Sequence, residues 1–335
     1  MIYPIEHYQS KLSVKDTQFA IKKVKDGFQK ALANNLNLMR VSAPLFVNKK
    51  SDLNDGLDGS QTPVSFQVPF LDDQIEIVHS LAKWKRMALK KYGMDMHQGL
   101  YTDMNAIRKD EPTLDNIHSI YVDQWDYEVI IAKEERNLET LFSVVRKVYE
   151  ALKKVEMDIG ELFPCLEKKL APEIHFVSTL ELEEMYPNLT RKEREKAICL
   201  KYGSVFLYGI GWPLKDGKPH DSRATDYDDW NLNGDILVYD KVLDIGLELS
   251  SMGIRVDEDS LVKQMRYMNE EEKGKDSPYV QDILHQRLPY TIGGGIGQSR
   301  ICMFFLDKAH IGEVQCSIWD QKDIQDASEK GIFLL

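Results

Sequence analysis

Cysteine is scarce in this 335-residue chain, and the few cysteines that occur are far apart. They are Cys165, Cys199, Cys302 and Cys316, and no two of them form a CxxC pair. A disulfide framework or a zinc cluster needs closer spacing, so neither is expected, and a reducing cytoplasm fits the pattern. Cys302 and Cys316 stand in apolar sequence, which predicts that both are buried and chemically inert.

Long apolar runs are missing as well. No stretch of about 18 uninterrupted apolar residues occurs, which excludes a membrane-spanning helix. The first residues contain no basic segment followed by an apolar one, so no signal peptide is expected. Internal repeats and low-complexity tracts are also absent from the sequence.

An excess of basic residues is the third absence. The chain has 43 Lys and Arg against 54 Asp and Glu, a net charge of −11. This balance argues against non-specific binding to nucleic acid or to an anionic membrane, because both need a basic surface. With 43% hydrophobic and 29% charged residues, the composition is that of a folded globular protein of one large domain or two ordinary ones.

Apolar periodicity predicts helices and strands in irregular alternation. Helices are expected around residues 21–32, at 81–92 and at 133–159. A further helix is expected to begin after a capping box at 190–193 and to end at Gly203. Strands are expected at 76–79, 205–210 and 235–239, and 269–277 is expected to be a surface loop.

Two further strand-like segments, 100–108 and 117–128, are separated by only eight residues, which suits an antiparallel hairpin. These features predict an α+β fold with a mainly antiparallel central sheet flanked by helices, not a doubly wound parallel sheet.

Residues 291–306 combine a glycine cluster with an apolar run of helical length. Glycines let the backbone approach a flat or phosphorylated ligand, and free N–H groups at a helix start attract negative charge. Arg300 falls in the first turn of this helix, where the helix dipole disfavours a cation. That placement favours a functional interpretation over one in which the glycines only permit tight packing. Neither the P-loop nor the dinucleotide fingerprint is matched.

The predicted hairpin brings several polar side chains together. Gln124 and Asp126 share one face if 118–126 is a strand, and Arg108 at the end of the partner strand would add a cation. Such a group suits an amino-acid or phosphate pocket. The alternative is a solvated hairpin with a surface ion pair.

Two carboxylates form a third candidate site. Asp235 and Glu248 flank a segment long enough for a hairpin, which would bring them together to hold Mg²⁺ beside a phosphate. The alternative is one exposed acid and one at a strand end. The acidic segment 221–230 is expected to be a solvated loop.

These segments together resemble the signature motifs of class II aminoacyl-tRNA synthetases. Residues 39–45, which include Pro44, resemble the first motif, and Arg108 with the acids at 110–111 resembles the second. The run Gly-Gly-Gly-Ile-Gly-Gln-Ser-Arg at 293–300 resembles the third.

Longer runs resemble a narrower family, the ammonia-dependent asparagine synthetases or aspartate–ammonia ligases. They are Val-His-Ser-Leu-Ala-Lys-Trp-Lys-Arg at 78–86, Tyr-Val-Asp-Gln-Trp-Asp at 121–126, Asp-Tyr-Asp-Asp-Trp at 226–230, Leu-Asn-Gly-Asp-Ile-Leu-Val at 232–238, and Glu-Leu-Ser-Ser-Met-Gly-Ile-Arg at 248–255. The resemblance extends from about residue 10 to the C-terminus. It implies a single catalytic domain over residues 1–335 and a homodimer whose interface includes the first motif.

The resemblance also implies a reaction that uses ATP and Mg²⁺. A carboxylate of aspartate attacks the α-phosphate of ATP, giving β-aspartyl adenylate and pyrophosphate. Ammonia then displaces AMP and gives asparagine. That the β-carboxylate is the one activated depends on the resemblance alone.

The roles implied for individual residues fall into three sets. The catalytic set is Arg108, Arg300 and Asp126. ATP is expected to contact Arg108, Ser119, Asp235, Glu248, Ser251, Arg255 and Arg300, with Asp235 and Glu248 holding Mg²⁺. Substrate is expected to contact Asp55, Ser80, Lys85, Gln124, Asp126, Gly293 and Gly294. Lys85, Gln124 and Ser80 would bind its carboxylate. Asp55 or Asp126 would bind its α-ammonium group, or one of the two would take a proton from ammonium.

Three other functions are less well supported. A tRNA synthetase would need an anticodon-binding barrel before the motifs, which begin near residue 40, and the acidic charge predicts no tRNA partner. A non-catalytic paralogue should have lost charged site residues that this chain retains. A glutamine-dependent synthetase needs an N-terminal cysteine nucleophile, and here Ile2 follows the first methionine.

Overall fold

The computed structural model describes residues 5, 8–57, 61–111 and 114–335. Its helices are α1 (Val14–Leu36), α2 (Ala82–Lys91), α3 (Leu138–Leu162), α4 (Thr179–Met185), α5 (Arg191–Tyr202), α6 (Glu258–Tyr267), α7 (Glu271–Lys275), α8 (Pro278–Leu284), α9 (Gln298–Phe305) and α10 (Gln321–Glu329). Its strands are β1 (Leu38–Arg40), β2 (Phe46–Asn48), β3 (Ser65–Gln67), β4 (Gln74–Ile77), β5 (Gly99–Ile107), β6 (Tyr121–Ile130), β7 (His175–Ser178), β8 (Ser204–Tyr208), β9 (Asp228–Asp240), β10 (Ile245–Arg255) and β11 (Thr291–Gly297).

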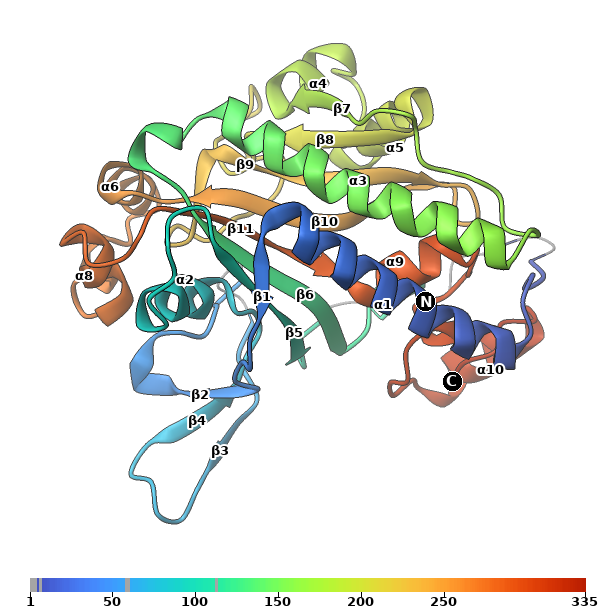
Figure 1. The fold of residues 1–335 in the computed structure, drawn as a ribbon, viewed down its shortest axis with the longest axis horizontal. Helices are drawn as coiled ribbons and strands as arrows, with labels where there is room; N and C mark the ends of the chain where they lie inside the picture. Colours follow the sequence, from blue (N-terminus) through green and yellow to red (C-terminus); the bar gives the residue numbers. More distant parts are fainter. Residues whose placement is uncertain (1–4, 6–7, 58–60, 112–113) are drawn as a thin grey trace.

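A large sheet lies at the centre of the molecule (Figure 1), with the strand order β1-β5-β6-β11-β10-β9-β8-β7. Neighbouring strands in it are antiparallel except at the two edges, where β1 runs parallel to β5 and β7 parallel to β8. The hairpin expected from residues 100–128 is formed by β5 and β6, with Asp103 opposite Trp125. The prediction of an α+β fold with a mainly antiparallel sheet is confirmed.

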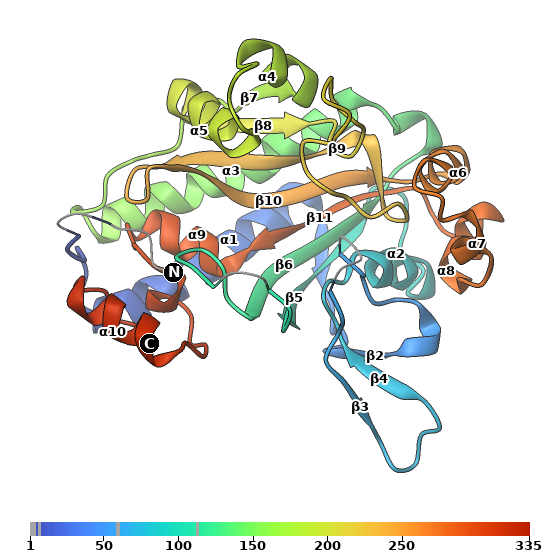
Figure 2. The same ribbon diagram turned by 180° about the vertical axis from the view of Figure 1, so that it is seen from behind.

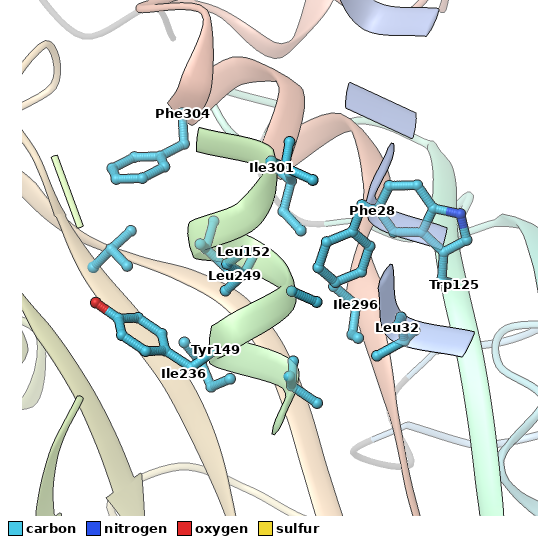
Figure 3. Packing of buried hydrophobic residues seen from close by; sticks show 14 of the residues in the cluster. Phe28, Leu32, Trp125, Tyr149, Leu152, Ile236, Leu249, Ile296, Ile301 and Phe304 are labelled. Carbon is cyan, nitrogen blue, oxygen red and sulfur yellow. The ribbon is translucent and has the colours of Figure 1, made fainter. Parts of the chain in front are cut away.

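The two longest helices, α1 and α3, lie side by side over one face of this sheet (Figure 1). Every third or fourth residue of α1 is apolar and buried, including Phe28 and Leu32, because a helix of this periodicity turns one stripe toward the core. The Phe28 ring lies 4.7 Å from that of Trp125 on β6. Leu152 of α3 packs in the same cluster (Figure 3). This packing decides which face of β6 is apolar.

The second, smaller sheet has the order β2-β4-β3 and projects from the body of the molecule (Figure 2). It carries exposed aromatic side chains, and Phe70 in its connecting loop is 83% exposed. Within the part of the chain that the structure describes, no helix is long and apolar enough to cross a membrane.

Several predicted elements are confirmed with shifted ends, and two predictions are wrong. α5 has the expected capping box at Thr190, and Gly203 ends it with a φ of 76°. The helix expected from residue 133 begins at Leu138, because the side chain of Asn137 caps it. The predicted loop 269–277 contains α7, which packs between α6 and α8. Cys302 is buried as expected, but Cys316 is exposed.

A buried histidine near the C-terminus predicts acid sensitivity. The Nδ1 atom of His310 accepts a hydrogen bond from the N–H of Gly312 at 3.0 Å, and burial lowers its pKa from 6.5 to about 4. The unfolded chain therefore binds a proton at His310 at higher pH than the native protein does. The contribution of neutral His310 to stability is complete above pH 6.5 and is lost as the pH falls toward 4.

We expect the free energy of unfolding to fall by about 2 kcal/mol through protonation of His310 when the pH is lowered from 7 to 5. Urea titrations at both pH values check this. His310→Asn keeps an acceptor that does not titrate and should remove the loss, whereas His285→Asn, at an exposed site, should not. An equal loss in both variants would contradict the assignment.

Candidate active site

A cavity of about 480 Å³ is bordered by β6, β10 and β11 of the large sheet and by the segments that precede β6 and β9. Trp125 packs against α1, so Gln124 and Asp126, which alternate with it along β6, face the side of the sheet away from α1. The cavity's polar lining includes Arg108, Glu111, His118, Ser119, Asp123, Gln124, Asp221, Ser222, Arg223, Tyr227, Glu248, Ser250, Ser251, Ser299, Arg300 and Gln315.

Three arginines from distant parts of the sequence meet at this cavity. Arg108 directly follows β5, Arg300 lies in the first turn of α9, and Arg223 precedes β9. The Nη2 atom of Arg108 donates to the carbonyl of His79 at 3.4 Å. Its Nε is buried and, among the described residues, has no hydrogen-bond partner. A half-buried guanidinium with an unused donor is suited to bind an anion.

The two proposed metal-binding carboxylates lie on adjacent strands but not directly opposite each other. Asp235 on β9 faces Ser251, and Glu248 on β10 faces Leu237, with a register shift between Glu248 and Ser250. Asp235 Oδ2 accepts from Arg223 Nη2 at 2.5 Å, and Glu248 Oε2 lies 3.7 Å from Arg300 Nη1.

Asp235 has the chemical character of a cation ligand. Its Oδ1 atom is buried and accepts no hydrogen bond from any described residue. Burial raises its pKa from 3.8 to about 7, Arg223 opposes the rise, and the nearby charge of Glu248 adds to it. A divalent ion bound by one or two carboxylates and by phosphate oxygens would neutralise this buried group, so the chemistry of the two carboxylates fits Mg²⁺. Of the two, Glu248 lines the cavity and Asp235 does not.

The acidic segment 221–230 is not the solvated loop that was predicted. Asp228 and Asp229 are buried at the start of β9, and Asp226 forms an ion pair with Lys83 at 2.6 Å. Buried cations neutralise these acids, since Asp229 pairs with Arg136 at 2.9 Å. The segment thereby contributes Arg223 and Tyr227 to the cavity.

A buried charge network borders this site. Lys85 Nζ lies 2.9 Å from the carbonyl oxygen of Gly294 and 3.1 Å from Asp126 Oδ2. Lys85 and Asp126 are 1% and 2% exposed, and neither lines the cavity. Asp126 Oδ1 is buried and bonds to no described residue.

Arg255, expected to contact ATP, belongs to the same network. Its Nη2 lies 2.7 Å from Glu128 Oε2, and its Nη1 bonds Asp228. It is 2% exposed and does not line the cavity. The structure therefore places Arg255 in a buried ion-pair network and not at the cavity wall.

Of the other residues predicted to contact ATP or substrate, some line the cavity and some do not. Ser119 and Ser251 line the cavity. Ser80 donates to Asp55 Oδ2 at 2.8 Å, and both lie outside the cavity wall.

The glycines that line the cavity are Gly295 and Gly297, not the expected Gly293 and Gly294. A Cβ on Gly295 would approach Gln124 Oε1 to 2.5 Å, so glycine leaves room for that amide.

The glycine segment differs from its prediction in one respect. Residues 291–297 form strand β11, and α9 begins only at Gln298. The N–H of Ser299 in its first turn donates to Asp123 Oδ1 at 3.1 Å. The protein's own carboxylate therefore occupies the N–H of Ser299, which is not free for a ligand.

Sequence reasoning missed Arg223, Tyr227 and His118. His118 Nδ1 lies 2.9 Å from Asp115 Oδ1, which orients the ring at the cavity. No local spacing distinguished these residues, because each depends on which strands are neighbours. The run at 226–230 was the one signal close to Arg223.

Solved structures share this fold. The chain aligns with asparaginyl-tRNA synthetase from Pyrococcus horikoshii complexed with asparaginyl-adenylate, with a TM-score of 0.65, 17% identity and coverage of 90% of this chain and 68% of that one. It aligns with aspartyl-tRNA synthetase from Entamoeba histolytica with a TM-score of 0.61, 16% identity and coverage of 91% and 59%. The fold is that of class II tRNA synthetases.

Sequence relatives are much closer. Aspartate–ammonia ligase of Clostridium perfringens is 58% identical over 329 residues, which cover 98% of this chain and 97% of the relative. The enzyme of the same name from Lactiplantibacillus plantarum is 57% identical over 313 residues, covering 93% and 97%. The family model described as aspartate-ammonia ligase matches residues 15–331. This chain therefore belongs to the aspartate–ammonia ligase family.

Proposed function

We propose that this protein makes L-asparagine from L-aspartate and ammonia, with ATP as co-substrate and β-aspartyl adenylate as intermediate. The observation that carries the proposal is the meeting of Arg108, Arg300 and Glu248 at one cavity beside the buried Lys85–Asp126 pair. In a member of this family, these are the charges needed to bind a nucleotide and an amino acid together.

In the first step, a carboxylate oxygen of aspartate attacks the α-phosphorus of ATP, and the bond to pyrophosphate breaks. Negative charge accumulates on the α-phosphate as the bond forms. Arg108 has an unused buried Nε donor and would stabilise this charge. Arg300, with Ser119 and Ser251, would hold the nucleotide.

Asp235 and Glu248 would hold the Mg²⁺ that accompanies ATP, for which their oxygens are suited. Bound Mg²⁺ offsets the negative charge of the pyrophosphate that leaves. In the present structure both carboxylates face arginines that line the cavity.

Aspartate would bind between the cavity and the buried network. Gln124, Lys85 and Ser80 are proposed to bind its carboxylate, beside the backbone of Gly293 and Gly294. Asp126, with its free buried Oδ1, is proposed to bind the α-ammonium group, and Asp55 is the alternative.

In the second step, the ammonia nitrogen attacks the acyl carbon of the adenylate. The new C–N bond replaces the acyl–oxygen bond, AMP leaves with the electron pair, and the nitrogen loses a proton. One of the two aspartates is proposed to accept a proton from ammonium.

The decisive experiment incubates the protein with Mg·ATP, aspartate and ammonium, without tRNA or glutamine. Formation of AMP and asparagine in equal amounts is the expected result. Aspartate-dependent exchange of pyrophosphate into ATP without asparagine would point to a tRNA synthetase instead.

We also propose that residues 1–335 form one catalytic domain that acts in the cytoplasm. We propose that the protein is a homodimer whose interface includes the 39–45 segment. Met39 and Leu45 are exposed apolar side chains in this segment, 54% and 49% exposed. Sedimentation should give twice the chain mass of 38.7 kDa. Leu45→Glu should shift the mass toward the monomer because it places a charge in the interface, whereas Phe333→Glu, at another exposed site, should not. A monomeric wild-type protein would contradict this proposal.

A further inference from the structure

Arg223 forms an ion pair with Asp235, one of the two carboxylates proposed to bind the metal. Its Nη2 lies 2.5 Å from Asp235 Oδ2, and its Nη1 lies 3.2 Å from Asp221 Oδ2. The side chain is 12% exposed and lines the 480 Å³ cavity, so its guanidinium has open space beside it. Arg223 belongs to none of the segments that resemble the family's motifs.

Carboxylates and cations are interspersed around Arg223. Asp221, Asp235 and Glu248 lie near the cations Arg223, Arg300 and Lys192. A triphosphate would add further negative charge to this end of the cavity. It can bind there only if cations turn from the carboxylates to the phosphates.

We propose that Arg223 is a displaceable counter-ion that neutralises Asp235 in the metal-free protein and contacts the phosphates of ATP when a divalent cation takes its place. This inference depends on the proposed function for its nucleotide, and it adds a third phosphate-binding arginine to Arg108 and Arg300.

Competition for Asp235 is the physical reason for the displacement. A divalent ion on Asp235 and Glu248 attracts the same oxygens as Arg223 and repels its guanidinium. Arg223 also bonds the carbonyl of its neighbour Ser222 at 3.0 Å and the exposed Asp221. These contacts within its own loop would keep the side chain at the cavity after it leaves Asp235.

The test compares two binding measurements on wild type and Arg223→Gln. Mn²⁺ serves as the probe of the nucleotide-free protein, with free Mn²⁺ followed by electron paramagnetic resonance, and Mg·ATP binding is followed by calorimetry. We expect the variant to bind Mn²⁺ roughly 5- to 10-fold more tightly, because a competing cation is gone, and Mg·ATP at least about 10-fold more weakly. Arg223→Lys should fall between wild type and Arg223→Gln in both measurements.

The opposite direction of the two effects distinguishes displacement from a structural role. If Arg223 only orients Asp235, Mn²⁺ and Mg·ATP binding should weaken together, and that result would overturn the proposal, as would no change in either. Arg191→Gln, on α5, removes a more exposed arginine–aspartate ion pair, to Asp216 at 2.9 Å, and should change neither. Wild-type protein that makes no asparagine would refute the proposed function, while the binding comparison would still decide the role of Arg223.

Discussion

Arg108→Gln is expected to lower aspartate-dependent exchange of pyrophosphate into ATP by roughly 10²- to 10³-fold, the usual loss when one preorganised donor to a transition-state charge is removed. Arg108 is the arginine at the cavity whose side chain forms no ion pair with any described carboxylate, so its charge is not already used by the protein. Glutamine keeps polar contacts but removes the cation. Initial rates of isotope exchange at saturating ATP and aspartate check the prediction.

Lys109→Gln is the matched control. Lys109 is the next residue, but its side chain is 42% exposed and pairs with Asp110 at 2.8 Å. Its loss should leave the exchange rate within about twofold of wild type, since exposed ion pairs contribute little. Equal losses in the two variants, or a normal rate in Arg108→Gln, would remove Arg108 from the proposed catalytic set.

Glu248→Gln is expected to raise the Mg²⁺ concentration required for half-maximal asparagine formation by roughly 10- to 100-fold, a range that residues supporting metal ligands already reach. The neutral amide cannot offset the charge of the metal, while its size is almost unchanged. A titration of Mg²⁺ at fixed ATP and aspartate measures the effect.

Asp244→Asn provides the comparison. It lies in the turn between β9 and β10, pairs with Lys196 at 2.5 Å and is 60% exposed. Its Mg²⁺ dependence should match that of wild type. A Glu248→Gln protein with an unchanged Mg²⁺ requirement would contradict the ligand assignment, and Asp235 would then need a different partner for the metal.

The proton acceptor in the second step can be examined with Asp126→Asn. Hydroxylamine attacks as a neutral amine, so it does not need an acceptor for the proton of ammonium. If Asp126 has that role, the variant should use hydroxylamine better than ammonia. Loss of turnover with both nucleophiles would favour the substrate-binding role that the free buried Oδ1 suggests.

Local sequence patterns predicted much of the fold because they depend on nearby residues. The apolar stripe around Phe28 predicted α1, and the capping box at Thr190 predicted the start of α5. The close spacing of two strand-like segments predicted the β5–β6 hairpin, from which Arg108 and Gln124 both line the cavity. Composition could not predict α7, because charged residues are common both in loops and on exposed helices.

By itself, the sequence determined the family, the α+β class and the cavity residues Arg108, Gln124, Glu248 and Arg300. Only the tertiary structure decided which charges stay inside the protein. Strand order places β6 beside β11 and β11 beside β10, and this order buries Arg255 against Glu128 and leaves Arg223 at the cavity on Asp235. Ion pairing between residues far apart in the chain depends on strand neighbours and on burial, and neither has a local signature in the sequence.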